Sequence, residues 1–190
     1  MIIHVMDVEN LRVLGISVSG NVSARELLTR SKEELLLIED SGKLNALKEI
    51  CLEVCRCQAD DVAAVRSSAD AYAVISPELR FLDHEECWII LLDSANHVIA
   101  KESITKGGLT SCILDVRRIV KSCLIANAVS VIMAHNHPGG GRMPSSSDIR
   151  QTERLKKALD LFDINLLDHI IVTDDGFYSF AEGEHKSLVH

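Results

Sequence analysis

Apolar residues in the first third of the chain recur at helical spacing. Two S-x-x-E sequences, which begin at Ser23 and Ser31, resemble the capping boxes that start helices. The polar sequence EDSG at 39–42 predicts a turn. Residues 22–58 are therefore expected to form two or three short helices, and the boundary of this unit is expected in the polar stretch 60–68. The apolar positions with a period near 3.6 are Leu44, Leu47, Ile50, Cys51, Val54 and Cys55.

From about residue 67 onward, apolar runs typical of strands alternate with helical stretches. The pattern predicts helices over 68–82, 115–128 and 145–161, and Pro77 is expected to break or kink the first of these. It predicts strands over 87–93, 97–103, 129–134, 164–172 and 176–180, the first two of which form a hairpin. This interleaving predicts an α/β domain over 67–190, preceded by a small helical region over 1–66.

Composition narrows the class of protein. The chain has 190 residues, 47% of them hydrophobic and 25% charged, which argues against a disordered or low-complexity protein. The formal net charge of −8 disfavours general binding to nucleic acid and to anionic membranes, because both depend on Lys and Arg. No stretch has the length and apolarity of a membrane span, and no basic leader is visible. A cytoplasmic protein without a membrane partner is expected.

The six cysteines do not predict a disulfide framework, since the chain is long enough to bury a core and shows no secretion signal. The sequence CLEVCRC at 51–57 contains no C-x2-C pair, and no second cluster completes a tetrahedral metal site. Cys51 and Cys55 are spaced i, i+4 on a predicted helix. We therefore expect them to be small buried hydrophobic residues.

The sequence MAHNHPGGGRMPSSSD at 133–148 carries the candidate chemistry. His135 and His137 are two residues apart, so on an extended chain their side chains point to one face. They are expected just past the end of an apolar strand, followed by a loop rich in Pro and Gly. Asp148 follows eleven residues after His137. Two imidazoles and one carboxylate suit Zn2+, and three protein ligands leave a fourth position for water.

A purely structural role is an alternative for part of this set. Ser145 and Asp148 form S-x-x-D before a predicted helix, which is a capping box that needs no metal. Asp148 is not expected to serve fully as both cap partner and metal ligand. Ser145 could cap the helix while its hydroxyl or its backbone N–H faces the water.

The spacing H-x-H-x7-S-x2-D, formed by His135, His137, Ser145 and Asp148, resembles the signature of the JAMM (MPN+, JAB) zinc hydrolases. The stretch AHNHPGGGRMPSSSD, with LLDHIIV at 166–172, is similar to the RadC branch, a family labelled DNA repair. The resemblance covers 67–190 well and extends more loosely to 22–58. Gly139 and Gly141 replace a Ser and an acid of the branch, and neither position is a metal ligand.

This resemblance implies a JAMM/MPN-type curved mixed β-sheet flanked by helices, with one zinc ion held by His135, His137 and Asp148. It implies cleavage of an amide or isopeptide bond in a peptide or protein substrate. Glu102, on the second strand of the hairpin, matches the general base, and Ser145 matches the residue that stabilises the oxyanion. Glu85 and Glu86 are less suitable because they precede the first strand.

Several alternatives remain open at this point. A non-catalytic MPN binding module and a protein acting on or near DNA are the competing functions. Residues 1–66 resemble a degenerate helix-hairpin-helix, but the two acids of the turn at 39–42 oppose a phosphate. His169 is either a buried structural residue or a partner of the metal site. An unpaired edge of the hairpin would favour a homodimer.

Overall fold

The computed structural model describes residues 41–60, 62–106, 114–141, 143–173 and 176–187. The chain divides into two compact units, residues 1–58 and 59–190. In the described part of the first unit, helix α4 (Ser41–Asp60) accounts for the helical apolar pattern after residue 43. Ser41 and Gly42 already belong to this helix, so the predicted turn at 39–42 is wrong for its second half. The helices predicted before residue 41 lie outside the described residues.

The second unit is built on one six-stranded mixed sheet in the order β2-β1-β3-β4-β5-β6. Only β3 and β4 pair in parallel among these neighbours, and the other pairs are antiparallel. β2 lies at one edge, as the dimer prediction requires, but the oligomeric state stays a prediction. The strands are β1 (Glu86–Leu92), β2 (Val98–Lys106), β3 (Ser130–Asn136), β4 (Asn165–Val172), β5 (Gly176–Ser179) and β6 (Glu184–Ser187).

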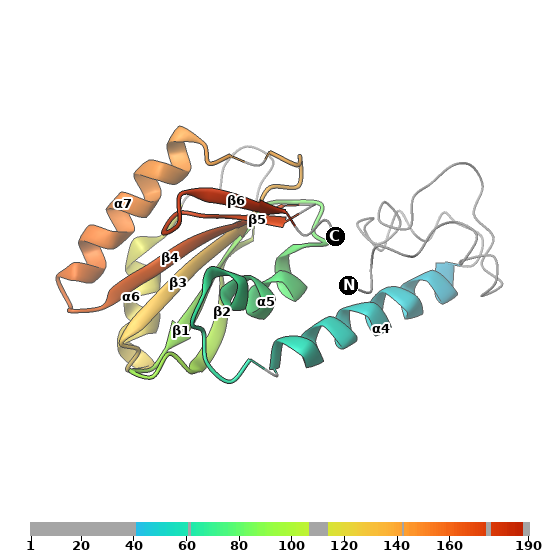
Figure 1. The fold of residues 1–190 in the computed structure, drawn as a ribbon, viewed down its shortest axis with the longest axis horizontal. Coiled ribbons are helices and arrows are strands. Elements are labelled where there is room, and N and C mark those ends of the chain that lie inside the picture. The colour runs from blue at the N-terminus through green and yellow to red at the C-terminus, as the bar shows by residue number, and fades with distance from the viewer. Residues whose placement is uncertain (1–40, 61, 107–113, 142, 174–175, 188–190) are drawn as a thin grey trace. The chain divides into compact units, whose positions relative to one another are not determined.

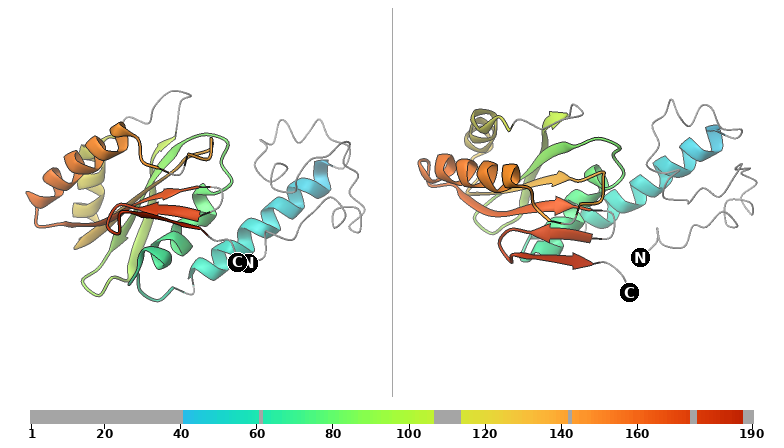
Figure 2. Two further views of the ribbon diagram at one scale, coloured as in Figure 1. Left: turned by 45° about the horizontal axis from the view of Figure 1, so that its top comes forward. Right: turned by 90° about the horizontal axis from the view of Figure 1, so that it is seen from above.

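Helices cover both faces of this sheet (Figures 1 and 2). Helices α6 (Val116–Ile125) and α7 (Ser146–Asp160) pack on one face, over a core that includes Ile89 and Met133. Helix α5 (Ser68–Leu79) packs on the other face, over alternate residues of the same strands. Strand β3 is buried along its whole length because it is central and covered on both sides. The predicted α/β fold with a mixed sheet flanked by helices is confirmed.

Three local predictions were wrong. Helix α5 continues through Pro77 to Leu79, so the predicted break is wrong; burial of Ile75 and Leu79 on either side of the proline offsets the loss of one backbone hydrogen bond. His135 is not beyond the strand but belongs to β3, which extends to Asn136. A sixth strand, β6, follows β5 in a short hairpin that the sequence did not indicate. Its sequence, EHKS, lacks the apolar alternation of a half-buried strand.

The described residues also bear on cysteines and membranes. Cys87 and Cys123 are buried thiols, whereas the side chains of the other four cysteines lie outside the described residues. Within the described ranges, none of the helices combines the length and apolarity that crossing a bilayer requires. The cytoplasmic location stays a prediction.

Candidate metal centre

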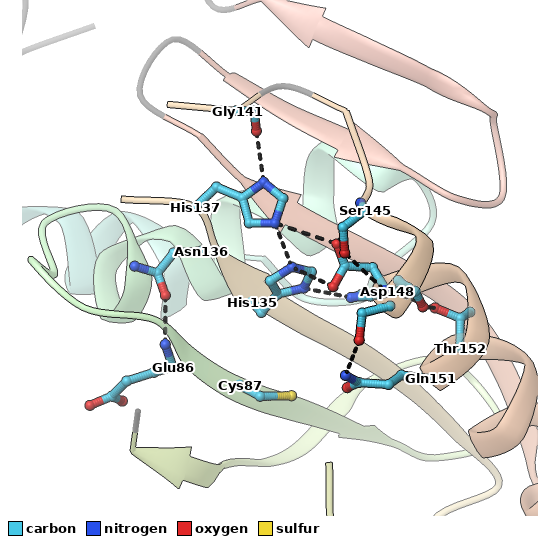
Figure 3. Close-up of polar contacts among 12 residues, drawn as sticks. Glu86, Cys87, His135, Asn136, His137, Gly141, Ser145, Asp148, Gln151 and Thr152 are labelled. Atoms are coloured by element: carbon cyan, nitrogen blue, oxygen red, sulfur yellow. Dashed lines mark hydrogen bonds and ion pairs between the residues drawn. The ribbon is translucent and has the colours of Figure 1, made fainter. Parts of the chain in front are cut away.

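Two histidines and one aspartate converge at the end of β3 and the start of α7 (Figure 3). The Nε2 atoms of His135 and His137 lie 3.0 Å apart. Asp148 places Oδ1 3.5 Å from His135 Nε2 and Oδ2 3.5 Å from His137 Nε2. Among the described residues, these three are the group whose ligand atoms lie close enough together to hold a metal ion. The structure therefore brings together the three residues that the sequence singled out.

The spacing of these atoms fits a tetrahedral metal. Ligand bonds of about 2.0–2.1 Å at tetrahedral angles place neighbouring ligand atoms about 3.3 Å apart, close to the 3.0 and 3.5 Å observed. Two neutral imidazoles with their Nε2 lone pairs facing each other would repel without a cation or proton between them. The chemistry of the donor set and its spacing thus suit a divalent ion such as Zn2+, while the identity of the metal stays a prediction.

Each histidine uses its other ring nitrogen for a protein contact. His137 Nδ1 lies 2.7 Å from the carbonyl oxygen of Gly141 in the glycine-rich loop. Because a carbonyl only accepts, Nδ1 of His137 carries the hydrogen and Nε2 is left with a lone pair. His135 Nδ1 lies 2.7 Å from Nε2 of His169 on β4. Both Nε2 atoms therefore face Asp148.

Asp148 also closes the N-terminal end of α7. Its Oδ2 accepts a hydrogen bond from the Ser145 backbone N–H (2.7 Å), and its own N–H donates to Ser145 Oγ (3.2 Å). This capping box coexists with the approach to His135 and His137, while the combination of cap partner and metal ligand in Asp148 stays a prediction. A carboxylate has about four acceptor sites on two oxygens, which is enough for both. The box therefore uses the Ser145 N–H as a donor and the Ser145 hydroxyl as an acceptor.

The electrostatics of the cluster follow from burial and from the charge of Asp148. Burial lowers the pKa of His135 to about 4. Burial also opposes protonation of His137, but hydrogen bonds with Asp148 and the Gly141 carbonyl, and the charges of Asp148 and Glu85, raise its pKa. Burial of Asp148 is outweighed by the hydrogen bond with His137, the charge of His135 and the contacts with Ser145, so the pKa of Asp148 falls well below its usual range. Asp148 is therefore an anion at neutral pH.

A cavity of about 420 Å³ is lined by His135, His137 and Asp148. Glu85, Cys87, Ser145 and Gln151 are among the other residues that line it. Glu102 does not line this cavity; its Oε2 accepts a hydrogen bond from Ser122 Oγ on α6 (2.6 Å). Although β2 carries Glu102 as predicted, the structure does not bring it to the ligands. Besides Asp148, the carboxylate that lines the cavity is Glu85, which was predicted to be less suitable.

Asn136, between the two histidines in sequence, holds the backbone on both sides of Glu85. Its Oδ1 accepts from the Glu86 N–H (2.8 Å), and its Nδ2 donates to the His84 carbonyl (2.8 Å). The side chain thus extends the β1–β3 ladder, whose outermost pair is Cys87 with His135. Glu85 therefore lies in a segment that is hydrogen-bonded directly to the end of β3, which carries His135.

The sequence patterns pointed neither to Asn136 nor to Thr152, whose Oγ1 lies 2.6 Å from His169 Nδ1, and they favoured Glu102 over Glu85. Thr152 follows Asp148 by four residues, so helical spacing could have placed it on the same face of α7. No spacing rule identifies Glu85, because its position depends on the pairing of β1 with β3, which are about fifty residues apart in sequence.

The chain is similar to proteins of one family. The family model of the RadC-like JAB domain matches residues 65–186. A UPF0758 protein of Flavobacterium johnsoniae is 36% identical over 157 residues, which cover 80% of this chain and 69% of that protein. A UPF0758 protein of Porphyromonas gingivalis is 40% identical over 120 residues, which cover 63% of this chain and 53% of that protein. One from Finegoldia magna is 32% identical over 185 residues, covering 92% and 81%.

Proposed function

Because the chain belongs to the RadC-like JAB domain family, we propose that it is a metal-dependent hydrolase that cleaves amide or isopeptide bonds. The observation that carries the proposal is one cavity that contains both a three-residue ligand cluster and a separate carboxylate, Glu85. His135, His137 and Asp148 hold a single Zn2+ in this proposal. When bound, Zn2+ would act as a Lewis acid and lower the pKa of a water molecule.

Glu85 is the proposed general base. It lines the same cavity as the proposed ligands, and its charge helps to raise the pKa of His137. Glu85 would accept a proton as the water oxygen attacks the carbonyl carbon, and would return that proton to the nitrogen as the C–N bond breaks. This assignment replaces Glu102, whose carboxylate is engaged by Ser122 on α6.

Ser145 is the proposed donor to the oxyanion. Its backbone N–H donates to the Asp148 carboxylate, and its hydroxyl accepts from the Asp148 N–H. The hydroxyl also interacts with that carboxylate, so its hydrogen would turn from Asp148 to the oxyanion when substrate is bound. Ser145 also lines the cavity. Removal of one such donor costs about 100- to 1,000-fold in rate where it has been tested. The negative charge of the whole chain favours a peptide or protein substrate over nucleic acid.

The test compares three zinc-loaded proteins: wild type, Glu85→Gln and Glu102→Gln. The substrates are a mixed library of internally quenched peptides and a peptide joined through a lysine ε-amide. We expect wild type and Glu102→Gln to cleave at similar rates and Glu85→Gln to be slower by about 100-fold or more. Zinc content is measured in all three and is expected to be equal.

Each alternative result has a distinct meaning. Loss of cleavage in Glu102→Gln with retention in Glu85→Gln would return the role of base to Glu102. A zinc-loaded wild type that cleaves no member of the library would contradict the hydrolase and favour a binding module.

A further inference from the structure

His135 and His137 reach the same tautomer by different routes. In His137, the Gly141 carbonyl requires the ring hydrogen to be on Nδ1. The partner of His135 is another imidazole, which can donate or accept, so the pair of rings does not by itself determine where the hydrogens lie. A further group must decide which nitrogen of His135 is free for a metal.

Thr152 is that group. Its Oγ1 lies 2.7 Å from the carbonyl oxygen of Asp148, one helical turn earlier, and 2.6 Å from His169 Nδ1. The carbonyl has no hydrogen, so the single hydroxyl hydrogen of Thr152 must point to it. Thr152 Oγ1 is then an acceptor toward His169, and His169 Nδ1 must carry the hydrogen.

The position of the hydrogen on His169 determines its position on His135. His169 is 1% exposed, and its two ring nitrogens contact Thr152 and His135 rather than a carboxylate, which favours the neutral ring. With Nδ1 protonated, Nε2 of His169 accepts from His135 Nδ1–H. His135 is thereby left with an unprotonated Nε2, directed at His137 and Asp148.

We infer that the Asp148 carbonyl, Thr152 and His169 form a hydrogen-bond relay that fixes His135 as the Nδ1–H tautomer and so keeps its Nε2 available to a metal ion. The inference rests on the metal site of the proposed function. His169 and Thr152 are positioning residues, since both act through His135. Stacking of His169 on Phe180, with ring centroids 4.5 Å apart, holds the intermediate ring in place.

The relay is tested by heteronuclear NMR of histidine ring nitrogens in metal-free protein, together with zinc affinity by competition with a chelator. The variants are Thr152→Val, which keeps the shape but lacks the hydroxyl, and Thr152→Ser, which restores it. We expect His135 to carry its hydrogen on Nδ1 in wild type and in Thr152→Ser. In Thr152→Val we expect a mixture of tautomers and zinc binding weakened by about 10- to 100-fold.

The metal-free spectrum separates this inference from the proposed function. A His135 ring with its hydrogen on Nε2 in wild type, or a Thr152→Val variant that binds zinc as tightly as Thr152→Ser, would overturn the relay even if the protein is a hydrolase. Conversely, absence of hydrolysis would refute the function and leave the tautomer result unchanged. Far-UV circular dichroism establishes that both variants are folded.

Discussion

The two faces of the sheet differ sharply at the end of β3. On the face covered by α6 and α7, the rings of His135 and His169 and the carboxylate of Asp148 form a nearly continuous polar network. On the opposite face, Asn136 makes backbone hydrogen bonds to His84 and Glu86. Figure 3 shows His135 and Asn136 pointing in different directions from neighbouring positions of one strand.

The difference shows how residues 135–137 can serve two structural purposes. The period-2 alternation of a strand sends adjacent side chains to opposite faces. The histidines of H-N-H can therefore supply metal ligands while the asparagine between them ties down the segment that carries Glu85. We call the face with His135, His169 and Asp148 the ligand face, and the face with Asn136 the clamp face. The ligand face depends on where the ring nitrogens carry their lone pairs. The clamp face depends on the hydrogen bonds of Asn136 to the backbone of His84 and Glu86. Their predicted sensitivities differ accordingly.

The largest expected effect is on the ligand face. Asp148→Ala should weaken zinc binding by more than about 100-fold, beyond the effect of losing an outer hydrogen-bond partner, because a charged ligand is removed. Asp160→Ala, at the other end of the same helix, is the matched control, since Asp160 is exposed and pairs only loosely with Lys156 (4.0 Å). Competition with a chelator measures both affinities. Equal zinc binding by the two variants would refute the site.

The clamp face should show the opposite behaviour. Asn136→Ala should leave zinc affinity nearly unchanged but reduce hydrolysis by roughly 10- to 100-fold, because Glu85 loses its fixed position. Hydrogen exchange of the Glu86 amide, which donates to Asn136, should accelerate in this variant. Asn136→Asp, which keeps an acceptor for that amide, should restore its protection. Loss of zinc in Asn136→Ala would show that the two faces are not separable.

The histidines of the ligand face should make the stability of the protein depend on pH. The pKa of His135 is lowered to about 4 by burial, and burial likewise lowers the pKa of His169 well below its ordinary value. Between pH 6.5 and about 4 the unfolded chain thus binds more protons at these two sites. The free energy of unfolding should fall as the pH is lowered through this window, by up to about 1.4 kcal/mol per pH unit for each such group.

His137 works in the other direction, since its raised pKa adds stability at low pH that is lost as the pH rises through that value. The raised pKa of His137 acts above pH 6.5, and so does that of His84, so neither opposes the fall expected between pH 6.5 and about 4. Urea unfolding with a chelator present measures the slope, which should be shallower in His135→Asn than in the control His97→Asn, where the exposed His97 is replaced. A flat profile in wild type would contradict the burial argument.

The smallest expected effect belongs to the helix cap that supports the ligand face. Ser145→Ala removes the acceptor for the Asp148 N–H and should cost about 1 kcal/mol of unfolding free energy. Ser146→Ala, at the first helical position, should cost less because it leaves the capping box intact. Urea unfolding at pH 7 compares them. A larger loss in Ser146→Ala would place the capping function elsewhere.

Local patterns predicted most of the elements that build the site. The H-x-H spacing placed two imidazoles on one face of an extended chain, and the S-x-x-D sequence started α7 where the structure starts it. The mixed α/β arrangement followed from the interleaving of strand and helix patterns. The break at Pro77 and the absence of β6 were wrong because the sequence does not show which residues pack α5 on the sheet, or that a polar edge segment pairs with β5.

The sequence by itself indicated the candidate metal ligands, because their spacing is carried by one strand end and one helix start, with His137 and Asp148 eleven residues apart. Only the tertiary structure decided which carboxylate and which outer partners join them. Glu85 reaches the cavity through the pairing of Cys87 with His135, and His169 reaches His135 through the parallel pairing of β3 with β4. Both contacts join residues more than thirty positions apart, and strand register rather than local spacing determines them.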